Sequence, residues 1–268
     1  MTELILLLLS CAVLGAVVGF LAGLLGIGGG LVIVPVLSSI LLYFAVLPAE
    51  QVVIVAIATS LASILFTSTA AAKAHHRNNN VPWHIAPWIM VGVAVGATVS
   101  GFFAPLLDAK VVSIIFVASV LLIAVKMAFG SNQPKQTHPL PNKGVLMLLS
   151  GVTGSVSAVI GIGGGALLVP LLTFFSVDIK KAIGCASASG IVIALFGSIG
   201  YISTGSQDLA LSHGFAGFVY LPALLGIVCT SWFTARLGAK ATQYLPVATI
   251  KKVFALLLVV MAMKLLVY

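Results

Sequence analysis

The 268-residue chain is 61% hydrophobic and only 7% charged, and its mean hydropathy is +1.25. Soluble domains carry about 25% charged residues, so this composition excludes an ordinary soluble protein and predicts an integral membrane protein. The formal net charge of +8 does not indicate nucleic-acid binding, because the basic residues stand singly among apolar stretches.

Apolar runs separated by Gly, Pro, Asn and charged residues predict ten membrane segments, since about 20 apolar residues cross a bilayer as a helix. Five lie in each half, at 3–25, 31–47, 51–73, 83–104 and 111–129, and at 144–160, 166–176, 182–203, 214–233 and 247–267. The polar stretch 130–143 is the predicted cytoplasmic linker between a first repeat, 1–129, and a second, 144–268. We therefore expect an all-α membrane protein.

The two predicted repeats share a glycine motif. Gly26-Ile27-Gly28-Gly29-Gly30, followed by Pro35, returns 135 residues later as Gly161-Ile162-Gly163-Gly164-Gly165, followed by Pro170. In a membrane, such broken backbone persists only where it is buried in protein or lines a wet cavity. Segment 166–176 is also too short to span the bilayer. We expect Gly-broken or re-entrant helices at the centre of two repeats of inverted topology.

The distribution of basic residues predicts the orientation. If every segment changes side, eleven of the 13 Lys and Arg fall on one side of the membrane and two on the other. The positive-inside rule makes the first side cytoplasmic, so both termini are expected outside.

Cofactor and metal sites are not expected. Cys11, Cys185 and Cys229 lie in apolar segments without CxxC spacing, as free buried thiols do. His75 and His76 are adjacent, and with His84 they flank a polar segment that we predict to be a solvated cytoplasmic loop, since adjacent histidines do not have the spacing of a metal site. The sequence therefore predicts no catalytic residues, no metal and no cofactor.

An anion site is the chemistry that the glycines favour. Helices that begin after them would present free N–H groups and the positive end of the helix dipole, without a Cβ in the way. Ionisable residues lie at segment ends, so a cation site has no carboxylates to use. The predicted substrate-binding residues are Gly28, Gly29, Gly30, Gly163, Gly164 and Gly165, with hydroxyls from Thr59, Ser60 and Ser187.

Structural alternatives stay open for these residues. The glycines could serve close helix packing, as we expect for Gly92 and Gly96, and the hydroxyls could bond a carbonyl one turn earlier. A membrane enzyme or cofactor carrier would need a nucleophile, base or metal at depth, and a structural subunit would not need duplicated helix breaks. A secondary permease for a small anion in the lipid bilayer is the favoured prediction, with a homo-oligomer left open.

The duplicated motif resembles the sulfite exporter TauE/SafE family. So does the run Ala56-Ile57-Ala58-Thr59-Ser60 with its counterpart Ala182-Ile183-Gly184-Cys185-Ala186. The resemblance implies a bacterial inner-membrane permease for small sulfur-containing anions such as sulfite or organosulfonates. The family motif reads A-V-G-T-S in each half, so Cys185 stands where a threonine is usual and is assigned to the site by this resemblance.

Overall fold

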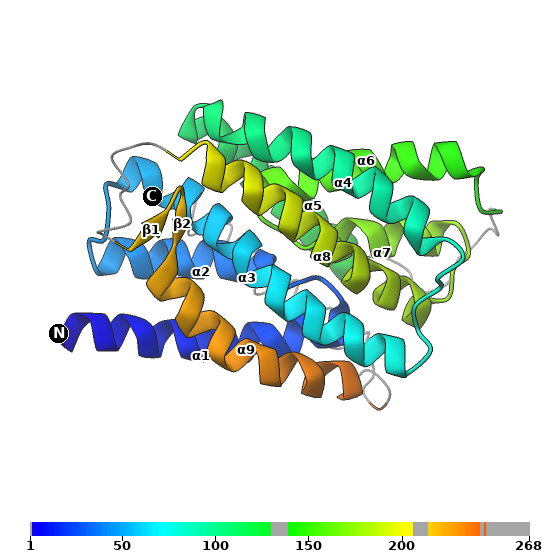
Figure 1. The fold of residues 1–268 in the computed structure, drawn as a ribbon, viewed down its shortest axis with the longest axis horizontal. Helices are drawn as coiled ribbons and strands as arrows, with labels where there is room; N and C mark the ends of the chain where they lie inside the picture. The colour runs from blue at the N-terminus through cyan, green and yellow to red at the C-terminus, as the bar shows by residue number, and fades with distance from the viewer. Residues whose placement is uncertain (1, 130–138, 206–213, 242–243, 245–268) are drawn as a thin grey trace.

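The computed structural model describes residues 2–129, 139–205, 214–241 and 244, so the predicted segment 247–267 lies outside the described residues. The described part is helical apart from one small hairpin (Figure 1). The elements are α1 (Thr2–Leu25), α2 (Gly30–Tyr43), α3 (Ala49–Arg77), α4 (Ala86–Phe103), the 3-10 helix η1 (Ala104–Leu106), α5 (Ala109–Phe129), α6 (Lys143–Val159), α7 (Gly165–Phe174), α8 (Ile179–Ser203), β1 (Phe215–Ala216), β2 (Val219–Tyr220) and α9 (Leu221–Ala241).

Several helices have the length and surface of membrane spans. Among the described residues, α1, α3, α4 with η1, α8 and α9 are long and apolar enough to cross a bilayer. Their outward faces are apolar as well, with Val13 and Val17 of α1 and Val95 of α4 exposed. Lipid tails are the natural neighbours of such faces, whereas water is not. The fold is that of a multi-pass helical membrane protein, as predicted.

Glycines on α1 bring it backbone to backbone with α9. Gly15, Gly19 and Gly23 are spaced one turn apart, and a Cβ added to any of them would collide with main-chain atoms of α9 between residues 227 and 239. The contacts advance in the same direction along both helices, so α1 and α9 are parallel (Figure 1).

The pair α4 and α6 is built in the same way. A Cβ at Gly92 would collide with Met147 O, and one at Gly96 would collide with Gly151 O. Close packing of small residues spaced four apart is common between membrane helices. The prediction that Gly92 and Gly96 serve packing is confirmed.

The centre of the bundle is formed by α3 and α8, the most buried of the apolar helices. They run antiparallel, because Gly190 of α8 faces Ser68 of α3 while Gly197, further along α8, faces Leu61, which is earlier in α3 (Figure 1).

Helices α2 and α7 follow the two glycine motifs and are short. They contain 14 and 10 residues, or about 21 and 15 Å of helix at 1.5 Å per residue, against a hydrocarbon core of about 30 Å. Helix α2 runs back alongside the α1–α3 layer instead of continuing α1 (Figure 1). The predicted helix breaks therefore exist, and neither short helix can cross a bilayer alone.

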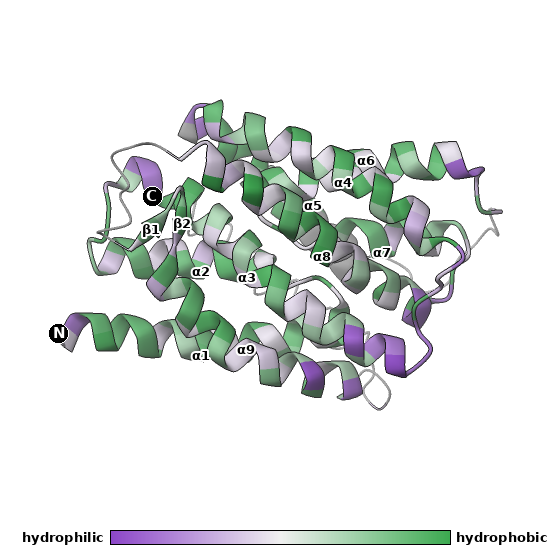
Figure 2. Ribbon diagram, viewed as in Figure 1, coloured by the Kyte–Doolittle hydropathy of each residue, from purple (hydrophilic) through white to green (hydrophobic). Residues whose placement is uncertain are grey.

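The charged residues gather at the ends of the bundle (Figure 2). We call the end where α3 and α9 finish and α6 and α8 begin the basic end. The contacts of Gly23 with Ala235, of Asn80 with Gly184 and of Lys143 with Trp88 bring these helix ends together. The basic residues of these terminal turns are Lys73, Arg77, Lys143, Lys180, Lys181, Arg236 and Lys240.

The ninth segment departs from the sequence prediction. Residues 214–233 were expected to form one helix, but α9 begins at Leu221, and Phe215–Tyr220 form an antiparallel hairpin. Gly214 and Gly217 adopt φ values of 81° and 58°, which a helix does not allow. An apolar run of this length does not by itself distinguish a buried hairpin from the first turns of a helix.

Candidate functional site

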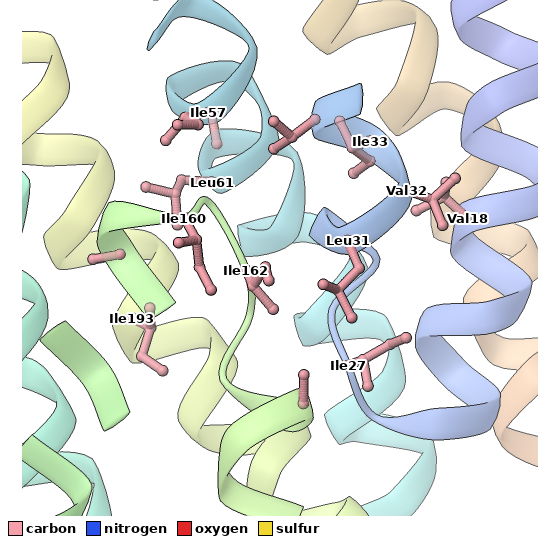
Figure 3. Close-up of a cluster of buried hydrophobic side chains, with 14 of the residues drawn as sticks. Val18, Ile27, Leu31, Val32, Ile33, Ile57, Leu61, Ile160, Ile162 and Ile193 are labelled. Atoms are coloured by element: carbon pink, nitrogen blue, oxygen red, sulfur yellow. The ribbon is translucent and has the colours of Figure 1, made fainter. Parts of the chain in front are cut away.

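The two glycine motifs meet inside the bundle. A Cβ built on Gly28 would lie 2.8 Å from Cα of Gly163, and one built on Gly163 would lie 2.9 Å from Cα of Gly28. The loops of the two motifs lie side by side, with Ile27 in the first and Ile162 in the second (Figure 3). We call this contact the glycine crossing. The glycines of the two motifs thus touch one another directly.

The contacts at the crossing occur in matched pairs. A Cβ at Gly30 would collide with the carbonyl oxygen of Gly161, and a Cβ at Gly165 would collide with that of Gly26. These are corresponding positions of the two motifs. Every one of these four glycines is buried, so the contact between the motifs is a main-chain contact.

The central helices hold the crossing from both sides in the same paired way. Gly26 packs against Ile183 of α8, and Gly161 packs against Ile57 of α3. Ile57 and Ile183 are the second residues of the two related runs in the sequence. The apolar surroundings keep water away from the main-chain groups of the loops.

The short helices begin at the crossing with free N–H groups. Gly29 and Gly164, with φ of 88° and 76°, are the N-caps of α2 and α7. The carbonyl oxygen of Gly29 accepts from Val32 and Ile33, both at 3.1 Å, and Gly164 accepts in the same way from Leu167 and Leu168. The earlier N–H groups, those of Gly30, Leu31, Gly165 and Ala166, have no acceptor within their helices.

Two hydroxyls of α3 bond the loop carbonyls. Ser60 Oγ donates to the carbonyl oxygen of Gly161 at 2.8 Å, and Thr67 Oγ1 donates to that of Gly28 at 3.2 Å. Thr67 is not among the predicted substrate-binding residues, whereas the structure makes it a direct partner of the crossing. These bonds satisfy two loop carbonyls, whereas the N–H groups of Gly30, Leu31, Gly165 and Ala166 have no acceptor within their helices.

Ser187 lies on the face of α8 that contacts the crossing. It stands between Ile183, which contacts Gly26, and Gly190, whose added Cβ would lie 2.7 Å from the carbonyl oxygen of Gly163. Its Oγ is buried and has no hydrogen-bond partner in the described part of the chain. Buried hydroxyls normally find a partner, so Ser187 is a free polar group beside the loops.

Thr59 and Cys185 are not brought to the crossing with the other candidates. Both stand two residues after the isoleucine that contacts a loop, which on a helix is nearly the opposite face. Thr59 Oγ1 instead accepts from the N–H of Tyr220 in β2, at 3.0 Å. Cys185 is buried beside Gly184, which contacts Asn80 at the basic end.

The histidines differ from the predicted solvated loop. Helix α3 continues to Arg77, so His75 and His76 are helical, and His75 is fully buried while His76 and His84 are exposed. The run of alanines from Ala70 to Ala72 extends the helix, and this helix-forming signal precedes the histidines. Among the described residues, no three His, Cys, Asp or Glu side chains are grouped to hold a metal ion.

Comparison with known proteins identifies the family. Residues 11–265 match the family model described as sulfite exporter TauE/SafE. A probable membrane transporter protein of Haemophilus influenzae is 38% identical over 264 residues, covering 95% of this chain and 96% of the relative. Probable membrane transporter proteins of Methanocaldococcus jannaschii and Bacillus subtilis are each 25% identical, over 90% and 94% of this chain and 88% and 95% of the relatives.

No solved structure gives a significant match to this chain. The family match spans nearly the whole sequence, includes both glycine motifs, and agrees with the apolar bundle described above. The chain is a membrane transporter rather than an enzyme, and it belongs to the sulfite exporter TauE/SafE family.

Proposed function

We propose that this protein is a secondary permease that exports a small sulfur-containing anion, such as sulfite or an organosulfonate, across the inner membrane. The observation that carries the proposal is the pair of buried helix N-termini at the glycine crossing. Free N–H groups and two helix dipoles make a site for negative charge that needs no basic side chain. Among the described residues, none of the buried side chains is a Lys or Arg, so the anion would be bound by dipoles alone.

The proposed site is the space between the first turns of α2 and α7 when the two loops separate. Gly28, Gly29 and Gly30 of one loop and Gly163, Gly164 and Gly165 of the other would contribute main-chain N–H groups. Ser187 would contribute its unpaired hydroxyl, and Ser60 would be released to donate when its Gly161 carbonyl moves away. Thr59 of α3 and Cys185 of α8 would support the site from the opposite faces of these two helices and would not contact the anion directly.

Transport would use two inverted repeats, 1–129 and 144–268, joined by the linker 130–143. The matched contacts of the crossing support this division, because each contact made by one motif has a counterpart made by the other. The parallel pairs α1–α9 and α4–α6 support it as well, with antiparallel α3 and α8 between them (Figure 1). An inside-negative potential favours anion exit by about 2.3 kcal/mol per charge per 100 mV, so export needs no coupling carboxylate.

Flux measurements on purified protein in proteoliposomes test the proposal. We expect labelled sulfite, thiosulfate or sulfoacetate to cross faster than in protein-free vesicles, with the rate rising as the membrane potential drives the anion. Ser187→Ala should weaken binding of the transported anion by about 1.5–3 kcal/mol, the usual contribution of a hydrogen bond to a charged group. Ser203→Ala is the matched control, because Ser203 is exposed at the end of the same helix. Equal affinities of the two variants would exclude Ser187 from the site, and no flux of any of the three anions would contradict the proposed substrate class.

The proposed orientation places the basic end in the cytoplasm and both termini outside. The basic residues of the terminal turns favour this orientation, while Glu3 and Glu50 lie in the first turns of helices that begin at the opposite end. A reporter that is active only in the periplasm, fused after Tyr268, should be active. Activity of a cytoplasm-specific reporter at the same position would contradict the ten-segment arrangement.

A further inference from the structure

Two fully buried side chains bond the last turns of the helices that precede the glycine loops. His75 Nε2 of α3 lies 3.1 Å from the carbonyl oxygen of Gly23 in α1, so this nitrogen carries the proton and donates it. Tyr201 Oη of α8 donates to the carbonyl oxygen of Ala158 in α6, at 3.3 Å. Both side chains are 0% exposed. We call these bonds the His75 tie and the Tyr201 tie.

The two ties occupy equivalent positions. Gly23 and Ala158 each stand three residues before the first glycine of a motif. The shift of 126 that carries Ala56 onto Ala182 in the related runs of α3 and α8 also carries His75 onto Tyr201. Two independent correspondences therefore agree that each half has one tie between a central helix and the helix entering a glycine loop.

The ties differ in their chemistry. An imidazole has an ordinary pKa of about 6.5 and changes charge within the physiological range, whereas a phenol has an ordinary pKa of about 10 and does not. The tie at the basic end can therefore take up a proton, and its counterpart cannot.

The surroundings of His75 do not accommodate a charged imidazolium. With Nε2 bonded to Gly23, the other nitrogen, Nδ1, is buried and has no partner in the described part of the chain. A proton on Nδ1 would add a buried positive charge and a second donor, both without a partner. Such a charge is costly unless it is paired or exposed to water.

The charged groups near this end would not offset that cost. The charged residues of α3 and of the elements packed against it are exposed at this end: Lys73, His76 and Arg77 of α3, Lys180 and Lys181 of α8, and Arg236 and Lys240 of α9. The single described carboxylate here, Asp178, is exposed and caps α8. Helices α1 and α2 have no charged residue at this end, and the buried thiol of Cys185 is only a weak hydrogen-bond acceptor. The side chain of Lys126 in α5 is not among the side chains that the structure describes.

We propose that His75 is a proton-binding site, neutral while the His75 tie is closed and protonated only after the tie opens to water at the basic end. The proton comes from that water and binds Nδ1, so a lower pH on the basic side favours the open tie. This inference rests on the proposed function. Protons would regulate transport from the basic end only, because Tyr201, at the equivalent position of the other half, does not titrate in the physiological range.

The first test needs no substrate. The unfolded chain binds a proton at His75 below about pH 6.5, whereas the closed tie does not, so unfolding is favoured as the pH falls. Between pH 7.5 and 5.5 the thermal midpoint of the detergent-solubilised protein should fall about 2–4 °C further than that of His75→Gln, whose amide keeps the bond to Gly23 without titrating. His84→Gln is the matched control, since His84 is exposed, and it should fall as the wild type does.

Two further variants place the side chain of each tie at the equivalent position of the other half. His75→Tyr should lose the pH dependence as His75→Gln does, and Tyr201→His should add to it. Equal pH dependence of the wild type and either His75 variant would overturn the proposal. In proteoliposomes, the sulfite flux of the wild type should change as the pH on the basic side is lowered from 7.5 to 5.5, and the flux of His75→Gln should not. If sulfite is not transported, only the proposed function fails, because the stability measurements stand without it.

Discussion

Replacing Gly165 or Gly30 with alanine is expected to destabilise the protein, although alanine is the better helix former by about 1 kcal/mol. Both glycines are the first residues of short helices, and their Cβ atoms would collide with the carbonyl oxygens of Gly26 and Gly161. Overpacking typically costs about 1–3 kcal/mol, and more where the obstructing atom is main chain that cannot change rotamer. We expect a lower thermal midpoint in detergent and a loss of anion flux.

Gly144→Ala is the control for these substitutions. Gly144 lies in the first turn of α6, and the nearest atom to its added Cβ is Asn142 Oδ1, at 3.7 Å. There the helix propensity of alanine is unopposed, so the midpoint should stay unchanged or rise. If Gly165→Ala behaved like Gly144→Ala, the close main-chain contact at the crossing would be contradicted.

Larger substitutions at the N-cap glycines are a weaker test of the anion site than the alanine substitutions. Gly29 and Gly164 have positive φ values, and their added Cβ atoms would contact Val18 and Ile193. Valine is strained in that backbone conformation and would also meet these side chains. Gly29→Val and Gly164→Val are therefore expected to disturb folding as well as transport, so their failure would not isolate the anion site.

Replacing Thr59 with valine is expected to release the hairpin of β1 and β2 from α3. Valine has nearly the shape of threonine but cannot accept the N–H of Tyr220, which bonds Thr59 Oγ1 at 3.0 Å in a buried position. Leaving a buried donor unpaired costs about 1–3 kcal/mol. The amide of Tyr220 should exchange its hydrogen faster by a similar free energy, measured by hydrogen–deuterium exchange.

Thr59→Ser is the matched control, because serine keeps the accepting oxygen. It should leave the exchange at Tyr220 nearly unchanged and lose only the packing of one methyl group. Equal exchange rates in the valine variant and the wild type would show that another group holds the hairpin. A fall in anion affinity without any change in exchange would instead return Thr59 to the substrate site.

The glycine motifs could be interpreted from the sequence because their signal is local and repeated. Two helix breaks at the same place in each half predict short helices after Gly30 and Gly165, and both are present. The motifs could not reveal that the loops touch, since the Gly28–Gly163 contact joins residues far apart in the chain. Glycine is the residue that both an open cavity and a close main-chain contact require, so the motif alone does not distinguish between them.

The side on which each hydroxyl lies was harder to predict. Thr59 and Ser60 are neighbours in the sequence but point to different partners, a hairpin amide and a loop carbonyl. That difference depends on which helix face meets the crossing, and α3 is apolar or small around most of its circumference. The burial of His75 could not be predicted for a related reason, because a histidine two residues from a helix end has the same local sequence whether it is buried or solvated.

The glycine crossing also bears on how the two halves can move. Packed helices usually resist sliding because side-chain ridges of one lie in the grooves of the other. Gly28 and Gly163 meet without side chains, so one loop can be displaced past the other without any rotamer change at the point of contact. The resistance to that motion then comes from the neighbouring isoleucines, among them Ile64 of α3, whose Cγ2 methyl lies beside both glycines.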